Sequence, residues 1–121
     1  MSSKPTIEYA DFEKIEMRVG EILEATAPSW STKLLQFSVS FGEELGTKTI
    51  LSGIKEWYSP ESFVGKKYPF VINLAPRKMG KPDLGSNQGA YSEGMMIMTD
   101  NPDQPRPFAL PEQSEVGAII R

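Results

Sequence analysis

The sequence predicts an all-β fold built from five main strands, with short helices beside or between them. Two observations support this class. The 121 residues include 10 glycines and 10 prolines, a content that favours frequent turns over long helices. In the middle of the chain, apolar residues alternate with polar ones at the period of two that is typical of strands with one buried face.

The N-terminal part predicts a short helix and then a long strand. The helix is expected over residues 11–15, because Asp11 can cap its start and apolar residues three apart share one face. The strand is expected over residues 17–26. Gly20 interrupts its alternation, which is common at a bulge or a sharp bend.

The clearest strand covers residues 35–41, where four large apolar residues alternate with polar ones. A turn at residues 43–46 and a third strand at residues 47–54 follow. A single helical turn is expected over residues 59–65, because Pro60 suits the first position of a helix and a glycine can end it.

The remaining strands are expected at residues 68–74 and 95–99, with shorter ones at 107–110 and 116–120. Five strands with a helix between the third and the fourth follow the chain order of an OB-fold, a five-stranded Greek-key barrel. An open β-sandwich is the alternative. Residues 1–121 form a single domain in this prediction, because a chain of this length can bury a core without a disulfide or structural metal.

The composition excludes many kinds of catalytic site. The chain has no cysteine and no histidine, so it lacks thiolate and imidazole metal ligands, a cysteine nucleophile and imidazole acid–base chemistry. The glycines between residues 80 and 89 are not followed by the Gly-Lys-Ser/Thr of a phosphate-binding loop. We therefore expect no enzyme activity, no catalytic residues, no metal and no cofactor.

The N-terminus lacks an apolar export signal, and no apolar run approaches the roughly 18 residues that a membrane helix needs. The default expectation is a cytoplasmic protein without membrane contact.

Charge is unevenly distributed along the chain. The net charge is -3, but residues 33–81 hold eight of the 13 basic residues and only four of the 16 acidic ones. Such a basic block can attract an anion, and the phosphate backbone of a nucleic acid is the commonest example. Composition alone favours the ordinary alternative, that these cations solvate strand surfaces.

The most unusual motif runs from Asn73 to Gly80. Pro76 fixes the exit from the predicted strand, and Arg77 and Lys78 follow it directly. Arginine can bind a phosphate in a bidentate way, whereas lysine provides a mobile point charge. Lys81 adds to this cationic segment.

The segment from Tyr91 to Met96 returns to the barrel and can form the second wall of a groove. A solvated loop followed by a core strand is the alternative, and core packing is the favoured interpretation of Met95, Met96 and Met98. Four aromatic residues are candidates for stacking on bases, although such residues more often fill cores. They are Trp30, Trp57, Tyr58 and Tyr91, and Tyr91 is the best candidate because it adjoins the groove.

The motifs in order resemble the tRNA-binding domain family. This family includes free-standing tRNA-binding proteins, the C-terminal domain of methionyl-tRNA synthetases and the CsaA group of export chaperones. The matching pieces are Asp11–Gly20, Lys33–Leu35, Ser52–Ile54, Asn73–Met79 and Ser92–Met95. Two segments depart from the family pattern: Ala27–Thr32 reads differently, and the loop from Gly80 to Tyr91 is longer. The acidic balance is a third departure.

The resemblance implies an OB-fold that recognises the shape of tRNA more than its sequence and that forms a homodimer. It also implies a nucleic-acid groove lined by Lys33, Asn73, Arg77, Lys78, Ser92, Glu93 and Met95. From their positions beside these residues, Lys81 and Tyr91 join the candidate site.

Apolar residues near both ends support the dimer, because a small barrel cannot bury all of them. They are Ile7, Tyr9, Phe12, Ile15, Ile119 and Ile120. A twofold interface is the commonest way to hide such residues.

The leading hypothesis is a non-catalytic tRNA-binding module, associated with an aminoacyl-tRNA synthetase. The alternative is a chaperone similar to the CsaA group, which takes unfolded or export peptides. Apolar groove residues such as Met79 and Leu84 favour this alternative. The sequence does not identify a particular tRNA or protein partner.

Overall fold

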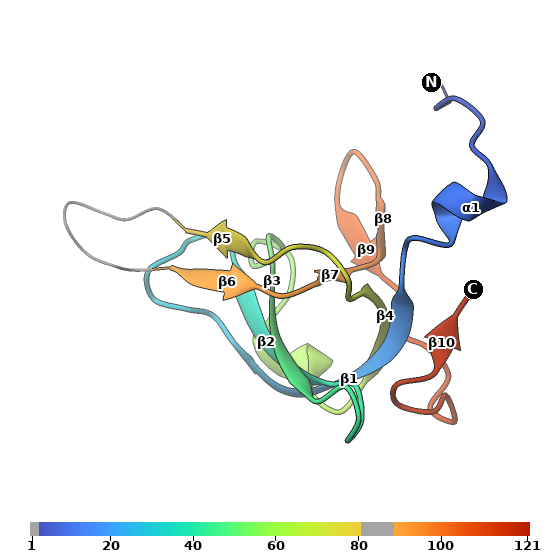
Figure 1. Ribbon diagram of the computed structural model, residues 1–121. Coiled ribbons are helices and arrows are strands. Elements are labelled where there is room, and N and C mark those ends of the chain that lie inside the picture. Colours follow the sequence, from blue (N-terminus) through green and yellow to red (C-terminus); the bar gives the residue numbers. More distant parts are fainter. Residues whose placement is uncertain (1–2, 81–88) are drawn as a thin grey trace.

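Five antiparallel strands curl into a nearly closed barrel in the computed structural model, which describes residues 3–80 and 89–121 (Figure 1). Their order in the sheet is β3-β2-β1-β4-β7. The bounds are β1 (Met17–Thr26), β2 (Leu35–Ser40), β3 (Thr47–Ser52), β4 (Lys67–Val71) and β7 (Met95–Met96). This arrangement confirms the predicted all-β barrel and agrees with an OB-fold.

Strand β1 organises the barrel because it pairs along both of its edges. Its first half pairs with β4 on one edge, from Met17 opposite Val71 to Glu21 opposite Lys67. Its second half pairs with β2 on the other edge. The register with β2 shifts between Ile22 and Glu24, and this bulge bends the strand.

The smaller elements lie around this barrel. They are α1 (Tyr9–Phe12), the 3-10 helix η1 (Pro60–Phe63), β5 (Arg77–Met79), β6 (Ala90–Ser92), β8 (Met98–Asp100), β9 (Pro105–Pro107) and β10 (Ile119–Ile120). The pairs β5–β6 and β8–β9 form separate two-stranded sheets, and β10 pairs with the start of β1. The ammonium group of Lys67 fastens the segment before β10 by donating to the carbonyls of Glu112 (2.7 Å) and Ser114 (2.6 Å).

The core confirms the predicted alternation. In β2, Leu35, Phe37 and Val39 are buried, whereas the residues between them are half-buried. The other main members are Ile22, Phe41, Ile50, Ile54, Phe63, Tyr68, Phe70 and Met96.

Gly20 has a different role from the one predicted. The bulge lies two to four residues further along β1, and Gly20 pairs regularly with Tyr68. A Cβ at this position would lie 2.6 Å from Val39 and 2.7 Å from Phe41 and from Phe70. Glycine is therefore needed here because the core approaches the backbone too closely for a side chain.

Three further predictions were wrong in detail. The first helix begins at Tyr9, and Asp11 lies inside its first turn, where its carboxylate accepts a hydrogen bond from the N–H of Glu8 (3.2 Å). The predicted fifth strand at 95–99 is divided into β7 and β8, and the strand predicted at 107–110 lies earlier, as β9. Ile97 separates β7 from β8, and its N–H donates to the carbonyl of Pro69 (3.0 Å).

Candidate functional site

The basic motif forms one strand of a hairpin that extends from the barrel (Figure 1). In this β5–β6 hairpin, Arg77 pairs with Ser92, Lys78 with Tyr91 and Met79 with Ala90. The sequence predicts a rim loop here, whereas the structure has two short strands, β5 and β6. Because side chains alternate along a strand, Arg77 and Lys78 lie on opposite faces of the hairpin.

The outer face carries Lys78 and Tyr91. The Lys78 ammonium nitrogen lies 5.3 Å from the centre of the Tyr91 ring, which is a cation–π contact. Both side chains are exposed. Lys78 is therefore held over an aromatic ring and remains open to solvent.

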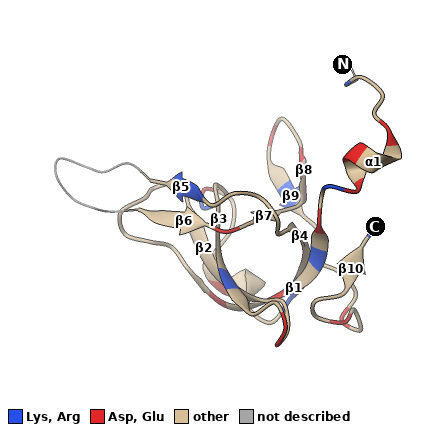
Figure 2. Ribbon diagram, in the orientation of Figure 1, with Lys and Arg blue, Asp and Glu red and all other residues tan. Residues whose placement is uncertain are grey.

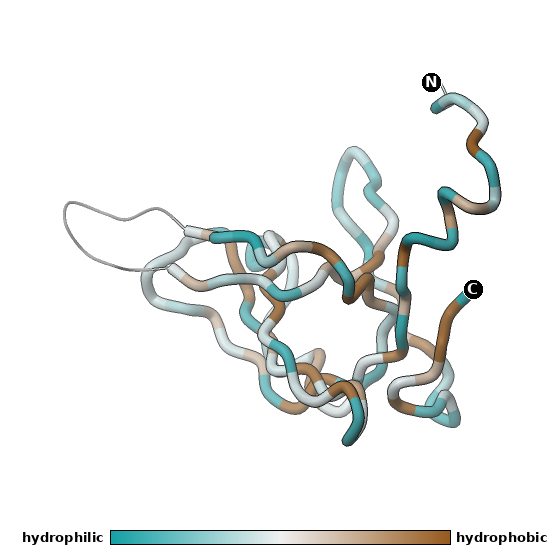
Figure 3. Tube along the Cα trace, viewed as in Figure 1, coloured by the Kyte–Doolittle hydropathy of each residue, from teal (hydrophilic) through white to brown (hydrophobic). Residues whose placement is uncertain are grey.

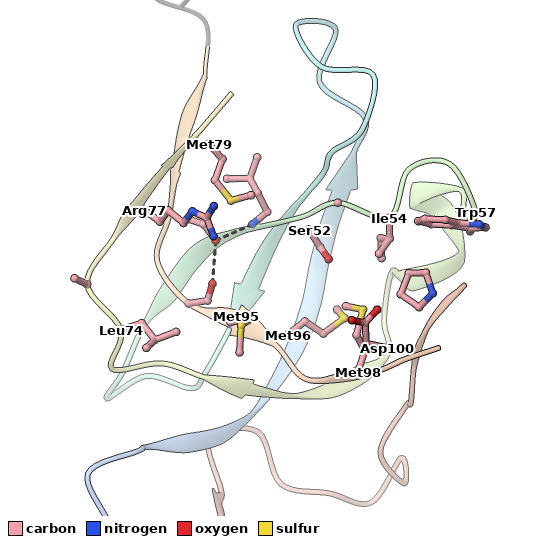
Figure 4. A pocket seen from close by; sticks show the side chains of 16 residues that line it. Ser52, Ile54, Trp57, Leu74, Arg77, Met79, Met95, Met96, Met98 and Asp100 are labelled. Atoms are coloured by element: carbon pink, nitrogen blue, oxygen red, sulfur yellow. Dashed lines mark hydrogen bonds between the residues drawn. The ribbon is translucent and has the colours of Figure 1, made fainter. Parts of the chain in front are cut away.

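The inner face carries Arg77 and Met79, and it forms one wall of a pocket of about 670 Å³ (Figure 4). The lining is mainly apolar and includes four of the six methionines of the chain: Met79, Met95, Met96 and Met98. Leu51–Ile54, Trp57 and Leu74 complete most of the wall. The ionisable side chains in the lining are those of Arg77 and Asp100.

The methionines differ in exposure. Met96 belongs to the core, as predicted, whereas Met95 is 49% exposed. Core packing was therefore the wrong interpretation for Met95, which points from the short strand β7 into the pocket (Figure 4).

Ser92 and Glu93 attach the hairpin to the barrel. The Ser92 hydroxyl accepts a hydrogen bond from the N–H of Leu51 (3.0 Å) and donates to the carbonyl of Gly94 (2.9 Å). A carboxylate oxygen of Glu93 accepts from the N–H of Thr49 (2.8 Å), and the N–H of Glu93 donates to the carbonyl of Thr49 (2.8 Å). Along this edge of β3, two side-chain hydrogen bonds and one backbone hydrogen bond hold the hairpin on the barrel.

Asn73 lies apart from the hairpin residues. Its amide oxygen accepts from the N–H of Glu16 (2.9 Å), and its amide nitrogen donates to the carbonyl of Lys14 (2.6 Å). The side chain therefore fixes the segment that joins α1 to β1.

The loop before β2 lies beside the hairpin. The Trp30 ring contacts the position of Gly80, where a Cβ would collide with it, and Gly80 has a positive φ of 90°. Lys33 lies further along this loop and is exposed. Its backbone carbonyl accepts a hydrogen bond from the backbone N–H of Lys55 (3.1 Å). Lys55 was not among the predicted site residues, although it lies in the basic block of residues 33–81, which is a signal for it.

We call Lys33, Lys55, Arg77 and Lys78 the basic rim. None of them forms an ion pair with a carboxylate within residues 3–80 and 89–121. The positive charge of β5 stands out at the hairpin end of the molecule (Figure 2). Lys81 and Leu84, which the sequence analysis also named, lie outside the described residues.

The apolar residues of the two termini gather at the other end of the molecule. Ile7, Tyr9, Ile15 and Ile119 are exposed, and short hydrophobic stretches occur near both ends of the chain (Figure 3). A groove of about 310 Å³ lies between the two termini, and Phe12 and Ile120 help to line it. We call this region the terminal apolar surface.

Over the part of the chain that is described, no helix is long and apolar enough to span a membrane. The same residues contain no group of three or more acidic, histidine or cysteine side chains arranged to hold a metal ion.

The known proteins to which this chain is similar include a family of tRNA-binding domains and two solved structures with the same fold. Residues 17–119 match a family described as "Putative tRNA binding domain". A solved structure of a MetRS related protein from Pyrococcus horikoshii has 31% identity and a TM-score of 0.83, and the match covers 98% of this chain and 100% of that one. A CsaA chaperone protein from Picrophilus torridus has 27% identity and a TM-score of 0.77, over 96% of this chain and 100% of that one.

A longer relative is the methionine–tRNA ligase of Flavobacterium psychrophilum. It is 40% identical over 114 residues, which are 94% of this chain. The chain spans only about 15% of the length of that ligase.

Proposed function

This chain belongs to the tRNA-binding domain family, and from this we propose that it is a non-catalytic module that binds tRNA through its basic rim. The observation that carries the proposal is the position of Arg77 and Lys78 on a protruding hairpin, without a described carboxylate partner. Phosphate contacts of this kind supply much of the affinity of proteins for nucleic acids.

The contacts that we propose do not read sequence. Arg77 forks onto a phosphate, whereas Lys33 and Lys78 act as mobile point charges. Contacts to phosphate and sugar position a nucleic acid without identifying its bases, so we expect the module to recognise the shape of tRNA.

The other candidate residues have supporting roles in this proposal. Ser92 and Glu93 hold the hairpin on β3, and Asn73 holds the N-terminal segment. Tyr91 supports Lys78, and Met95 lines the pocket beside Arg77. Lys81 extends the positive charge along the sequence.

A titration of the protein with total tRNA at several salt concentrations tests this function. We expect the logarithm of the affinity to fall linearly with the logarithm of the salt concentration. Bulk tRNA should also comigrate with the purified protein and leave it at raised salt. Absence of binding at low salt would contradict the proposal.

We further propose that the module assists an aminoacyl-tRNA synthetase in the cytoplasm by raising the local concentration of tRNA. The similarity to a segment of methionine–tRNA ligases supports this partner. Adding the protein to a methionine–tRNA ligase should lower the KM for tRNA without changing kcat, and the protein alone should charge no tRNA. An unchanged KM would argue against this partner.

A homodimer through the terminal apolar surface is the next part of the proposal. Two copies would cover Ile7, Tyr9, Phe12, Ile15, Ile119 and Ile120, and would present two hairpins to one tRNA. Ile119→Glu should convert the dimer to a monomer of 13.5 kDa in sedimentation experiments. Phe108→Glu is the control, because Phe108 is also exposed but does not line the terminal groove.

The apolar pocket favours a second candidate function, the capture of peptides. Methionine side chains are flexible and polarisable, and they suit binding surfaces that accept varied partners. If this function holds, Met79→Ala should weaken binding of unfolded peptides and leave the salt dependence of tRNA binding unchanged.

A further inference from the structure

We propose that the pocket on the inner face of the hairpin holds unpaired bases of the same RNA whose phosphates contact the basic rim. This inference rests on the proposed function. It adds a ligand class, single-stranded nucleotides with exposed bases, to the recognition of tRNA shape.

The size and lining of the pocket suit a nucleoside. Its volume of about 670 Å³ falls within the range of about 300–1,000 Å³ that is common for small-molecule sites. Trp57 lies in the pocket wall and is 39% exposed, so part of its indole ring is available for stacking on a base. Flexible methionine side chains can cover bases of different sizes.

The two charged groups in the lining also fit a nucleotide. Arg77 comes from the hairpin, whereas Asp100 comes from the end of β8 on the far wall (Figure 4). A guanidinium group binds phosphate or a base oxygen, and a carboxylate accepts hydrogen bonds from exocyclic amino groups. A nucleotide that enters beside Arg77 thus meets a cation near its phosphate and an exposed acceptor, Asp100, on the opposite wall.

The edge of β3 argues against an extended peptide as the occupant. A peptide that adds a strand to a sheet needs free backbone groups along the edge of that sheet. Along β3, the N–H groups of Thr49 and Leu51 already donate to Glu93 and Ser92. The pocket therefore offers side-chain contacts and stacking surfaces rather than a free strand edge, so a peptide could bind only through its side chains, whereas a base can use the whole lining.

Two ligands of equal charge test the inference: an adenosine ribo-octamer and an abasic octamer with the same ribose-phosphate backbone. The chain has two tryptophans, so a Trp30→Phe variant leaves Trp57 as the sole indole reporter. We expect the adenosine octamer to quench Trp57 fluorescence and the abasic octamer to leave it unchanged.

Affinities measured with the same two ligands complete the test. Trp57→Ala should weaken binding of the adenosine octamer by about 5-fold or more, the usual effect of losing one stacked base. It should leave binding of the abasic octamer unchanged, and Trp57→Phe should restore most of the loss. Phe108→Ala is the matched control, because Phe108 is 43% exposed and lies outside the pocket lining.

Three results would overturn the inference while tRNA binding persists. These are equal affinity for the two octamers, equal losses for both in Trp57→Ala, or quenching by an apolar peptide but not by the adenosine octamer. If wild-type protein binds no tRNA at all, the proposed function fails and this inference fails with it.

Discussion

Arg77 and Lys78 are neighbours in the chain, yet the two faces of the β5–β6 hairpin give them different surroundings. Arg77 lies with Met79 on the wall of an apolar pocket, whereas Lys78 lies over the Tyr91 ring on the outside. The sequence presents them as one cationic pair. The strand separates them, so the two cations face opposite sides of the hairpin.

Removing both cations should have the largest effect on the proposed binding. If each neutralises one phosphate, the variant R77A/K78A should reduce the log–log salt slope for tRNA by about two. The same relation gives a loss of affinity on the order of 10- to 100-fold at 0.1 M salt. Titrations with total tRNA at several salt concentrations measure both quantities.

The matched control for this variant is Lys14→Ala with Arg106→Ala, which removes two exposed cations outside the basic rim. It changes the net charge equally and should leave the slope almost unchanged. If the two faces act independently, the losses from the single variants of Arg77 and Lys78 should add. An equal slope for all these proteins would move the binding face elsewhere.

The next largest effect is expected on the stability of the fold, at the point where the hairpin joins the barrel. Ser92 is only 5% exposed, and Ser92→Ala leaves the N–H of Leu51 without its acceptor. We expect the free energy of unfolding to fall by about 1–3 kcal/mol, which urea unfolding measures. Ser59→Ala is the control, because the Ser59 side chain is exposed and does not cap η1. A similar loss in both variants would contradict the role given to Ser92.

A smaller effect, the coupling energy between two side chains, distinguishes the two faces of the hairpin directly. A double-mutant cycle for Tyr91→Ala and Lys78→Ala should give a coupling of about 0.5–1 kcal/mol in the free energy of unfolding. The cycle for Tyr91→Ala and Arg77→Ala should give almost none, because Arg77 lies on the other face. Equal couplings would mean that the faces are not separate.

The smallest effect is expected from pH. The chain has no histidine. A hydrogen bond from Arg106 lowers the pKa of the Asp103 carboxyl, and burial together with Tyr58 raises the pKa of the Tyr68 hydroxyl. Each shift places the pKa of its group further from neutral pH. The affinity for tRNA at fixed salt should therefore stay constant between pH 6 and pH 7, and a marked change would contradict this expectation.

The barrel could be predicted from the sequence because its signals are local. In β2, each buried residue alternates with a half-buried one, so the period of two was visible in the sequence itself. The residues at the short helical turn gave an equally local signal, through Pro60 and the glycine that follows.

The hairpin could not be predicted in this way. Its first strand is only three residues long and has two charged residues, so no alternation marks it. Its partner strand begins at Ala90, 11 residues after Met79, and its attachment depends on Ser92 and on a backbone N–H 41 residues away. Long-range hydrogen bonds of this kind leave no periodic signal.

Only part of the candidate site could be predicted from the sequence, because some of its features are local and others depend on the fold. The charges of Arg77 and Lys78 could be read directly, whereas their opposite orientation depends on the unexpected strand. Trp57 was one of four aromatic candidates. Its place on the pocket wall depends on the packing of the segment after β3 against β8 and β9, which the sequence did not specify.

Both ends of the described chain lie far from the hairpin (Figure 1). The segment before β1 and strand β10 leave the barrel on one side, and β5 and β6 extend on the other. A linker joined to either end would therefore start away from the hairpin and the RNA-binding surface proposed for it. Another protein could therefore be fused to either end of this domain without covering the basic rim on the hairpin.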